Sequence, residues 1–336
     1  MRQLGGEGLS PLAIEIHPSE FPARTRAAVL SGLRAGAIPA RCLYQSDGQA
    51  QLWLEYHRAY SPSRTDEEVR GLYRQAFRAA MTRSGAGPLA AISLGCGGGQ
   101  KDGELFDAVP PKARSRCAYA PLDTSPALVL EATLHVGRRH PDVRAHPLVV
   151  DLEARPDIGA WLDLRAGARL PRLYCAFGLL PNQDPVSLLA YLRGLLRSGD
   201  SLLLSANQSP RGLAEDGDAI LAQYDNVPAR AWYLGALAGL GIPPADVELR
   251  VEAIPVRTDE GWWRIDVRVL PRRNLQIRLH EEIVQFRAGE PVALFRSHRF
   301  TPAGLLARLD AAGLGIAGHW QGAGGQEGIY LLRGVP

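Results

Sequence analysis

A glycine-rich segment is the first part of the sequence whose residue types indicate chemistry. Residues 95–101 (GCGGGQK) follow a short apolar run and precede a helical pattern. Glycines at such a turn let the backbone bend sharply and let a ligand approach without a Cβ in the way. We therefore expect a ligand-binding loop at the carboxyl edge of a parallel sheet. A dinucleotide fingerprint needs a third glycine at its sixth position, which is Gln100 here, so the segment disfavours NAD and favours S-adenosylmethionine, which has no pyrophosphate.

Two acids stand at the ends of the next two apolar runs. Asp123 ends the run over residues 117–123, and Asp151 ends the run over residues 143–151. A carboxylate at the first position is placed to accept both hydroxyls of a ribose, and a carboxylate at the second is placed to meet an adenine edge. Either acid alone would equally be a helix cap or a solvated loop residue. Three consecutive strand ends that carry a glycine loop and two acids together favour a nucleoside site, with S-adenosylmethionine as the better nucleoside.

The elements that must position these residues follow an alternation of strand and helix patterns. Strands are expected over 89–95, 117–123, 143–151, 172–178 and 200–207, with helices over about 125–140 and 185–198. Short runs rich in apolar residues and separated by helices predict a parallel sheet with helices on both faces. The fold class is therefore α/β, with a doubly wound sheet.

The alternation stops after the fifth predicted strand. Residues 213–240 have a helical pattern, and antiparallel strands are expected within 247–295. A helix over 301–314 and two final strands then follow, so the sheet is expected to be interrupted by a β-rich insertion and resumed at the C-terminus.

The N-terminal part is predicted less regularly. Residues 1–20 are expected to be loosely ordered, and helices are expected over 22–36 and 66–83. The aromatic-rich segment between these two helices is expected to be irregular, because it contains Asp47-Gly48 and Pro62.

Composition excludes several classes of protein. The 336 residues are 46% hydrophobic and 22% charged, which are ordinary values for a packed globular protein. The net charge of +3 provides no strong basic field for binding nucleic acid. No apolar run approaches the roughly 20 residues that a membrane span needs, and no secretory signal peptide is evident. We expect a cytoplasmic protein that acts on a small molecule, and its oligomeric state stays open.

Cysteine and histidine spacing indicates no metal site. The four cysteines form no C-x-x-C pair, and the eight histidines form no H-E-x-x-H motif. Lysine occurs only at Lys101 and Lys112, which makes the lysine of the glycine-rich segment conspicuous. His57 and His298 lie near the motifs described next but are expected to be structural or solvent-facing.

Several short motifs together resemble the histidine-specific Nα-methyltransferases of ergothioneine biosynthesis. They are residues 43–44 (LY), 60–65 (YSPSRT), 94–101 (LGCGGGQK), 121–125 (PLDTS), 181–182 (PN), 224–225 (YD) and 297–302 (SHRFTP). The resemblance runs from about residue 35 to residue 315, and its weight lies in the order and spacing of the motifs.

This resemblance implies a class I S-adenosylmethionine methyltransferase fold with a second, β-rich substrate lobe. The lobe would comprise residues 15–73 and 213–296, and the cofactor-binding domain residues 74–212 and 297–336. The residues expected to hold S-adenosylmethionine are Gly95, Cys96, Gly97, Lys101, Asp123, Asp151, Leu152 and Gly178. The residues expected to hold the acceptor are Tyr44, Tyr60, Asn182, Tyr224, Phe295 and Ser297, of which Tyr44, Tyr60 and Asn182 would also orient the reacting group.

One position departs from the family pattern. The family places a Glu-x-Ser triplet near the end of the insertion, where the glutamate reads the imidazole, and this sequence has Phe295-Arg296-Ser297. A site built around a buried hydrogen-bonding acid discriminates strongly, so its loss should weaken selection of histidine. Phenylalanine offers an apolar or stacking surface instead. The prediction is therefore an aromatic acceptor, with an indole-bearing compound first, histidine second and a guanidino compound such as arginine third.

The expected chemistry is in-line methyl transfer from a sulfonium, which needs no metal and no covalent intermediate. Methylation at nitrogen is the default, although an indole acceptor leaves methylation at carbon open. Two other hypotheses compete: a NAD-linked oxidoreductase on the same type of sheet, and a non-catalytic descendant that only binds a ligand or partner. Stabilisation by S-adenosylhomocysteine but not by NADH would favour the methyltransferase.

Overall fold

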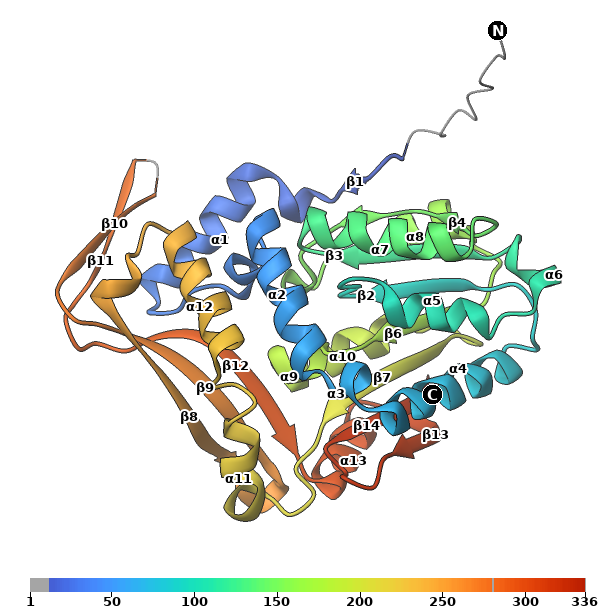
Figure 1. The fold of residues 1–336 in the computed structure, drawn as a ribbon. Coiled ribbons are helices and arrows are strands. Elements are labelled where there is room, and N and C mark those ends of the chain that lie inside the picture. The colour runs from blue at the N-terminus through green and yellow to red at the C-terminus, as the bar shows by residue number, and fades with distance from the viewer. Residues whose placement is uncertain (1–11, 280, 336) are drawn as a thin grey trace, which may run out of the picture.

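A mixed sheet forms the centre of the protein in the computed structural model, which describes residues 12–279 and 281–335 (Figure 1). Within these residues the sheet has nine strands, and its order is β1-β5-β3-β2-β6-β7-β14-β13, with β4 beside β3. Its strands are β1 (Glu15–Ile16), β2 (Ala90–Leu94), β3 (Ala118–Asp123), β4 (Arg144–Ala145), β5 (Leu148–Val149), β6 (Arg172–Ala176), β7 (Ser201–Asn207), β13 (Leu314–Gln321) and β14 (Glu327–Gly334). The strands from β1 to β7 pair in parallel, and β14 pairs antiparallel with both β7 and β13.

Helices cover both faces of this sheet because alternate strand residues point to opposite sides. Ile92 belongs to one apolar core and its neighbour Ala91 to another. The first core includes residues of α8 (Gly159–Leu162), α10 (Pro185–Leu195) and α13 (Pro302–Ala311). The second includes residues of α4 (Glu67–Arg83), α5 (Gln100–Asp107) and α7 (Pro126–Arg139). The predicted doubly wound α/β fold is confirmed, as is the return of the chain to the sheet after the insertion.

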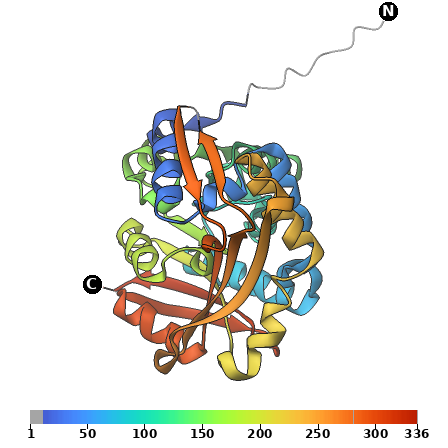
Figure 2. The same cartoon turned by 90° about the vertical axis from the view of Figure 1, so that its left-hand side faces the viewer.

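A third apolar core lies away from the central sheet (Figure 1). It is built from α1 (Pro22–Arg34), α12 (Val227–Gly239), the hairpin of β10 (Leu275–Leu279) and β11 (Glu282–Phe286), and the sheet of β8 (Val247–Arg257), β9 (Trp262–Pro271) and β12 (Val292–Phe300). α2 (Asp47–Tyr60) packs against this core and contacts α12. Figure 2 turns this side to the viewer and shows the β10–β11 hairpin (orange) beside α1 (blue), where Arg34 and Glu282 form an ion pair of 2.7 Å.

The predicted division into a lobe of residues 15–73 and 213–296 and a domain of residues 74–212 and 297–336 stays a prediction. Two observations bear on its limits: β1 pairs with β5 of the central sheet, and α4 continues across residue 73 while packing on that sheet.

Two N-terminal predictions are wrong. The segment between the first two predicted helices is not irregular, because it contains α2 and the short helix α3 (Pro62–Thr65). Ser46 begins α2 as its N-cap by accepting a hydrogen bond of 3.2 Å from the backbone N–H of Gln49. The loose order expected for residues 1–20 is wrong for residues 15–16, which form β1; residues 1–11 lie outside the described residues.

The helical stretch predicted over 213–240 is two helices, α11 (Leu213–Leu221) and α12. Asn226 caps the second helix by accepting from the backbone N–H of Ala229, and Pro228 follows in its first turn, which begins a new helix here. The remaining short helices are α6 (Pro111–Arg114) and α9 (Leu179–Asn182). No helix in the described ranges is long and apolar enough to cross a membrane.

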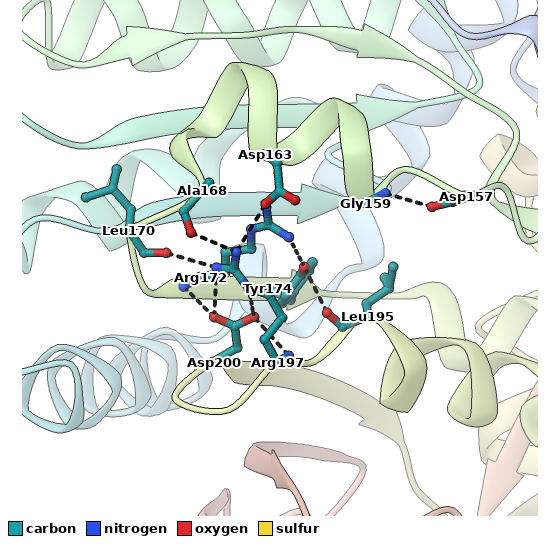
Figure 3. A network of polar contacts seen from close by, with 10 residues as sticks. All are labelled: Asp157, Gly159, Asp163, Ala168, Leu170, Arg172, Tyr174, Leu195, Arg197 and Asp200. Carbon is teal, nitrogen blue, oxygen red and sulfur yellow. Dashed lines mark hydrogen bonds and ion pairs between the residues drawn. The ribbon is translucent and has the colours of Figure 1, made fainter.

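A polar network fixes the amino-terminal end of β6, at the opposite edge of the sheet from the glycine loop (Figure 3). Asp200 accepts a hydrogen bond of 2.9 Å from the backbone N–H of Arg172 and pairs with Arg197 at 3.1 Å. The guanidinium of Arg172, which is buried, pairs with Asp163. Because buried charges need partners, this network is structural and anchors the chain before β6 to the sheet.

Candidate functional site

A cavity of about 710 Å³ opens at the carboxyl ends of the parallel strands. Its floor comes from the loops after β2, β3, β5 and β6, and α2, α12 and β12 contribute side chains to its walls. The predicted site residues that line it are Tyr44, Tyr60, Gly95, Cys96, Gly97, Lys101, Asp123, Asp151, Leu152, Gly178, Asn182, Tyr224 and Phe295. The structure therefore brings together residues that are up to 251 positions apart in the chain, between Tyr44 and Phe295.

The glycine loop needs its glycines for two separate reasons. Gly97 has a φ of +52°, and a Cβ built there would lie 2.8 Å from the ring of Trp53 on α2. Gly99 has a φ of +73°, and a Cβ there would lie 2.6 Å from Cα of Ala132 on α7. Side chains at these positions would be strained and would collide with their neighbours. These glycines therefore let the loop pack closely against α2 and α7, and Gly97 also lines the cavity.

Asp123 joins this loop to the end of β3. Its carboxylate accepts hydrogen bonds from the backbone N–H of Gly97, at 3.3 Å, and of Ser125, at 3.0 Å. Burial raises the pKa of Asp123 to about 6, although those backbone hydrogen bonds lower it. A buried carboxylate that faces a cavity and can accept further hydrogen bonds fits the two hydroxyls of a ribose.

We expect binding of S-adenosylmethionine to weaken as the pH falls below about 6. Because Asp123 has a raised pKa of about 6, it gains a proton below that pH and would lose the charge-assisted hydrogen bonds expected to the ribose. Affinity should be constant above pH 7 and should fall by up to about tenfold per pH unit below pH 6. Titration calorimetry between pH 5 and 8, in two buffers of different ionisation enthalpy, measures the affinity and the proton released on binding.

Asp102 provides the control for this pH dependence, because burial also raises its pKa to about 6. Its carboxylate accepts hydrogen bonds from Tyr119, at 2.6 Å, and Ser93, at 2.9 Å. The variant Asp102→Asn should keep the pH dependence of the wild type. An affinity that does not change between pH 5 and 8 would contradict the role given to Asp123.

Asp151 lines the cavity and also has two partners within the protein. Its Oδ1 caps a short turn by accepting from the backbone N–H of Glu153 at 2.9 Å, and its Oδ2 lies 3.3 Å from the guanidinium of Arg41. Arg41 also pairs with Glu20, whose carboxylate accepts a 2.8 Å hydrogen bond from the hydroxyl of Thr124. The N-terminal segment is thereby tied to the loops after β3 and β5, which line the cavity.

This ionic cluster was missed by the sequence analysis. Arg41, Glu20 and Thr124 contact residues that lie far away in the chain, and no local spacing indicates such pairing. Glu20 and Arg41 are largely buried, so each stabilises the other's charge.

Lys101 belongs to a second cluster of polar side chains in the cavity wall. Its Nζ donates a hydrogen bond of 2.9 Å to the hydroxyl of Tyr73, lies 4.0 Å from a carboxylate oxygen of Glu327, and stands 5.2 Å from the ring centre of Phe177. Burial lowers the pKa of Lys101, and Glu327 opposes that effect. The lysine was predicted, whereas Tyr73, Phe177 and Glu327 were not, because they come from three distant elements.

Aromatic rings surround the other end of the cavity. The Phe295 ring centre lies 5.5 Å from that of Trp232 and 6.0 Å from that of Tyr224. Tyr44 lies 5.5 Å from Trp232, and Tyr56 stacks on Trp232 at 5.8 Å. Such centroid distances are typical of attractive aromatic packing. The walls here are mainly aromatic rings, and the polar side chains of Gln223 and Arg299 also line this end of the cavity.

Tyr224 and Ser297 have different positions relative to the cavity. The hydroxyl of Tyr224 lies 2.7 Å from that of Ser297 and accepts a 2.7 Å hydrogen bond from Arg299. Ser297 is fully buried and is not part of the cavity wall, because Tyr224 stands in front of it. The structure therefore brings Tyr224, but not Ser297, to the place predicted for the acceptor.

Asn182 and Tyr60 reach the cavity from opposite sides. Asn182 ends α9, and its Nδ2 donates a 3.1 Å hydrogen bond to the carbonyl of Gly178, which leaves its Oδ1 free of that contact. Tyr60 ends α2 and packs against Tyr56 at 5.7 Å. Both residues line the cavity, and their predicted contact with the acceptor stays a prediction.

The two histidines near the motifs are uncharged. Burial lowers the pKa of His57 to about 3, and its ring stacks on Trp53 at 4.8 Å. Burial lowers the pKa of His298 to about 4, and its Nδ1 accepts a 2.9 Å hydrogen bond from the indole N–H of Trp262. His298 lies outside the cavity wall and has a structural contact, as expected.

The donor groups fit a bound S-adenosylmethionine. The buried carboxylate of Asp123 and the ammonium of Lys101 would supply partners for the ribose and the amino-acid portion of such a ligand, and Gly95 and Gly97 bring backbone to the cavity. None of these residues requires a dinucleotide such as NAD as the ligand.

Comparison with known proteins assigns the chain to a family. The sequence profile of the family described as "Histidine-specific methyltransferase, SAM-dependent" matches residues 25–334. The histidine N-alpha-methyltransferase of Mycolicibacterium smegmatis is 25% identical over 316 residues, which cover 90% of this chain and 92% of that protein. The enzyme of the same name from Mycobacterium tuberculosis is 25% identical over 317 residues, with the same two shares.

Among solved structures, the Burkholderia thailandensis 1,6-didemethyltoxoflavin-N1-methyltransferase with bound S-adenosylhomocysteine is 13% identical. Its alignment covers 98% of this chain and 94% of that one, with a TM-score of 0.41. The family assignment rests on the sequence profile, which extends over nearly the whole chain. This protein therefore belongs to the histidine-specific, S-adenosylmethionine-dependent methyltransferase family.

Proposed function

We propose that the protein transfers a methyl group from S-adenosylmethionine to the amino nitrogen of an aromatic amino acid or a closely related aromatic metabolite. The observation that carries the choice of acceptor is the position of Phe295. Its ring is part of the cavity wall and packs among three other aromatic rings, those of Tyr224, Trp232 and Tyr233. The family pattern has a glutamate that reads an imidazole at this place, so this chain offers a stacking surface instead of a hydrogen-bonding acid.

The cofactor-binding residues proposed here divide by the part of the ligand that they would hold. Asp123 would accept hydrogen bonds from the ribose, Asp151 and Leu152 would meet the adenine, and Lys101 would face the amino-acid portion. Gly95, Cys96, Gly97 and Gly178 would present backbone to the ligand. Bound S-adenosylmethionine supplies an activated methyl group on a positively charged sulfur.

The chain's own contribution to the reaction is to position the acceptor and keep it desolvated. The hydroxyls of Tyr44 and Tyr60 and the amide of Asn182 would orient the amine, and alignment of the reacting atoms provides most of the rate enhancement. Burial raises the pKa of Tyr44, so its hydroxyl stays protonated and acts as a hydrogen-bond partner. Burial between the aromatic walls disfavours a charged ammonium, so the amine would lose its proton as it binds.

No histidine near the site is a candidate base in this mechanism. His57 and His298 both have strongly lowered pKa values, about 3 and about 4, so they are weak bases at neutral pH. The proton of the amine would leave through water or through a tyrosine hydroxyl.

A transfer assay tests the proposed acceptor. Label from S-adenosyl-[methyl-³H]methionine is followed into L-tryptophan, L-phenylalanine, L-histidine and L-arginine at equal concentrations. We expect kcat/KM for L-tryptophan or L-phenylalanine to exceed that for L-histidine by at least about tenfold, because an apolar pocket rewards apolar area and gives the imidazole no acid. Preferential labelling of L-histidine would contradict the aromatic acceptor, and preferential labelling of L-arginine would point to the guanidino alternative.

Nuclear magnetic resonance of the labelled product distinguishes methylation at nitrogen from methylation at an indole carbon. A thermal-shift comparison of S-adenosylhomocysteine with NADH provides the control for the cofactor, and stabilisation by the first compound alone is expected.

A further inference from the structure

A buried arginine at the acceptor end of the cavity has no anionic partner among the described residues. The buried arginines within these residues are Arg41, Arg172 and Arg299. Arg41 pairs with Glu20 and Asp151, and Arg172 pairs with Asp163. Arg299 is 3% exposed, is the most buried of the three, and forms no ion pair with a described carboxylate.

The groups that accept hydrogen bonds from Arg299 are neutral. Its Nη2 donates hydrogen bonds to the hydroxyl of Tyr224, at 2.7 Å, and to Oε1 of Gln223, at 3.4 Å. Its guanidinium carbon also stands 5.4 Å from the ring centre of Tyr224. These contacts solvate the cation in part but do not neutralise it. Because burying an unpaired charge is costly, a site of this kind is completed by an anion that arrives with a ligand.

Arg299 lies at the acceptor end of the cavity rather than the nucleoside end. It is part of the cavity wall, and its hydrogen-bond partner Tyr224 packs against Phe295. Six carboxylates line the cavity, and none of them forms an ion pair with Arg299; they are those of Asp102, Glu104, Asp123, Asp151, Glu153 and Glu327. An acceptor whose ring stacks at Phe295 would therefore have an uncompensated positive charge within the same compartment.

We propose that Arg299 binds the carboxylate of the acceptor. This inference rests on the proposed function and narrows it: the substrate is an aromatic amine that carries an acid, and the decarboxylated amine is a poor substrate. Arginine is suited to this task because its guanidinium is always charged and presents several donors to a carboxylate. The hydrogen bond from Arg299 also fixes the hydroxyl of Tyr224, which then adds a neutral contact beside the charged one.

Binding to the protein saturated with S-adenosylhomocysteine provides the test, with calorimetry as the measurement. Two pairs of probes are compared, L-tryptophan with tryptamine and L-histidine with histamine, so that the preference for a carboxylate is measured in whichever pair binds. We expect the wild type to bind the amino acid at least tenfold more tightly than the amine. Whether the tryptophan pair binds at all tests the proposed aromatic acceptor. The ratio of affinities within a pair tests the role of Arg299, so the two proposals can fail separately.

The variant Gln223→Glu supplies an internal counterion without changing the size of a side chain. Since Oε1 of Gln223 lies 3.4 Å from Nη2 of Arg299, a carboxylate there would compete with that of the acceptor. We expect the preference for the amino acid to fall to less than threefold. Gln75→Glu adds the same charge on an exposed position of α4 outside the cavity and should keep the wild-type preference.

Arg299→Met removes the charge itself and should abolish the preference while S-adenosylhomocysteine binds as in the wild type. The proposal is overturned if the wild type binds amine and amino acid equally, if Gln223→Glu keeps the full preference, or if neither pair of probes binds. It is also overturned if Arg299→Met folds but loses affinity for S-adenosylhomocysteine instead, because Arg299 would then hold the cofactor's own carboxylate.

Discussion

Asp123→Asn is expected to weaken the binding of S-adenosylmethionine by at least 100-fold. The carboxylate would accept two hydrogen bonds from the ribose, and a hydrogen bond to a charged group contributes about 1.5–3 kcal/mol. Loss of both corresponds to about 3–6 kcal/mol, or a factor of roughly 10² to 10⁴ in affinity. In the wild type the carboxylate accepts hydrogen bonds from the backbone N–H groups of Gly97 and Ser125. The amide of the variant would turn its own N–H group towards one of these donors, so that hydrogen bond would also be lost. Titration calorimetry with S-adenosylhomocysteine measures the loss.

Asp157→Asn is the matched control for this variant. Asp157 also lies on a loop of the central domain and accepts a 3.0 Å hydrogen bond from the backbone N–H of Gly159, but it is exposed and outside the cavity. Its variant should bind S-adenosylhomocysteine as the wild type does. Circular dichroism shows whether Asp123→Asn is folded, and an unchanged affinity in the folded variant would refute the assignment of Asp123 to the ribose.

The central sheet and the glycine-loop end of the cavity could be predicted because their determinants are local. A strand such as β2, the glycine loop after it and α5 are consecutive in sequence, and each is indicated by its own pattern. The position of Asp123 at the end of β3 follows from strand length alone. Parallel strands end at one edge of a sheet, and the hydrogen bond of 3.3 Å between Gly97 and Asp123 joins the glycine loop to the end of β3 at that edge.

The acceptor end was less predictable because its contacts join distant segments. α2 was missed, since Asp47-Gly48 reads as a turn, whereas Ser46 makes this dipeptide the first turn of a helix. That helix carries Trp53 and Tyr56 into the cavity wall. The clusters around Arg41 and Lys101 depend on partners up to 254 residues away, such as Tyr73 and Glu327, and no spacing rule indicates them.

The period of a strand accounts for the direction of side chains on β12 but not for their access to the cavity. Phe295 and Ser297 are two residues apart and pair with Val267 and Ile265 of β9, so they share a face. Only Phe295 reaches the cavity, because Tyr224 from the loop between α11 and α12 covers Ser297. Likewise, Trp262 and Trp263 point to opposite faces, and both are buried because each face of the sheet is covered there.

Phe295→Glu is expected to shift the preference between acceptors towards histidine by about 100-fold in the ratio of kcat/KM values. The new carboxylate would accept a charge-assisted hydrogen bond from an imidazole N–H, which contributes about 1.5–3 kcal/mol. An aromatic acceptor would lose ring stacking, which contributes about 0.5–1.5 kcal/mol. The sum of these two effects, about 2–4.5 kcal/mol, corresponds to a change in the ratio of roughly 30-fold to 2,000-fold. Competition between L-histidine and L-tryptophan for labelled methyl groups measures the ratio directly.

Phe295→Leu separates the chemistry of this side chain from its bulk. Leucine keeps the wall apolar but removes the ring that now lies 5.5 Å from Trp232 and 6.0 Å from Tyr224. This variant should methylate more slowly while keeping the preference for an aromatic acceptor over histidine. The assay is best run near pH 8, because burial among aromatic rings raises the pKa of the new glutamate and the carboxylate must be charged to select imidazole. If both variants have the acceptor profile of the wild type, residue 295 does not face the acceptor, and the aromatic wall has no part in substrate choice.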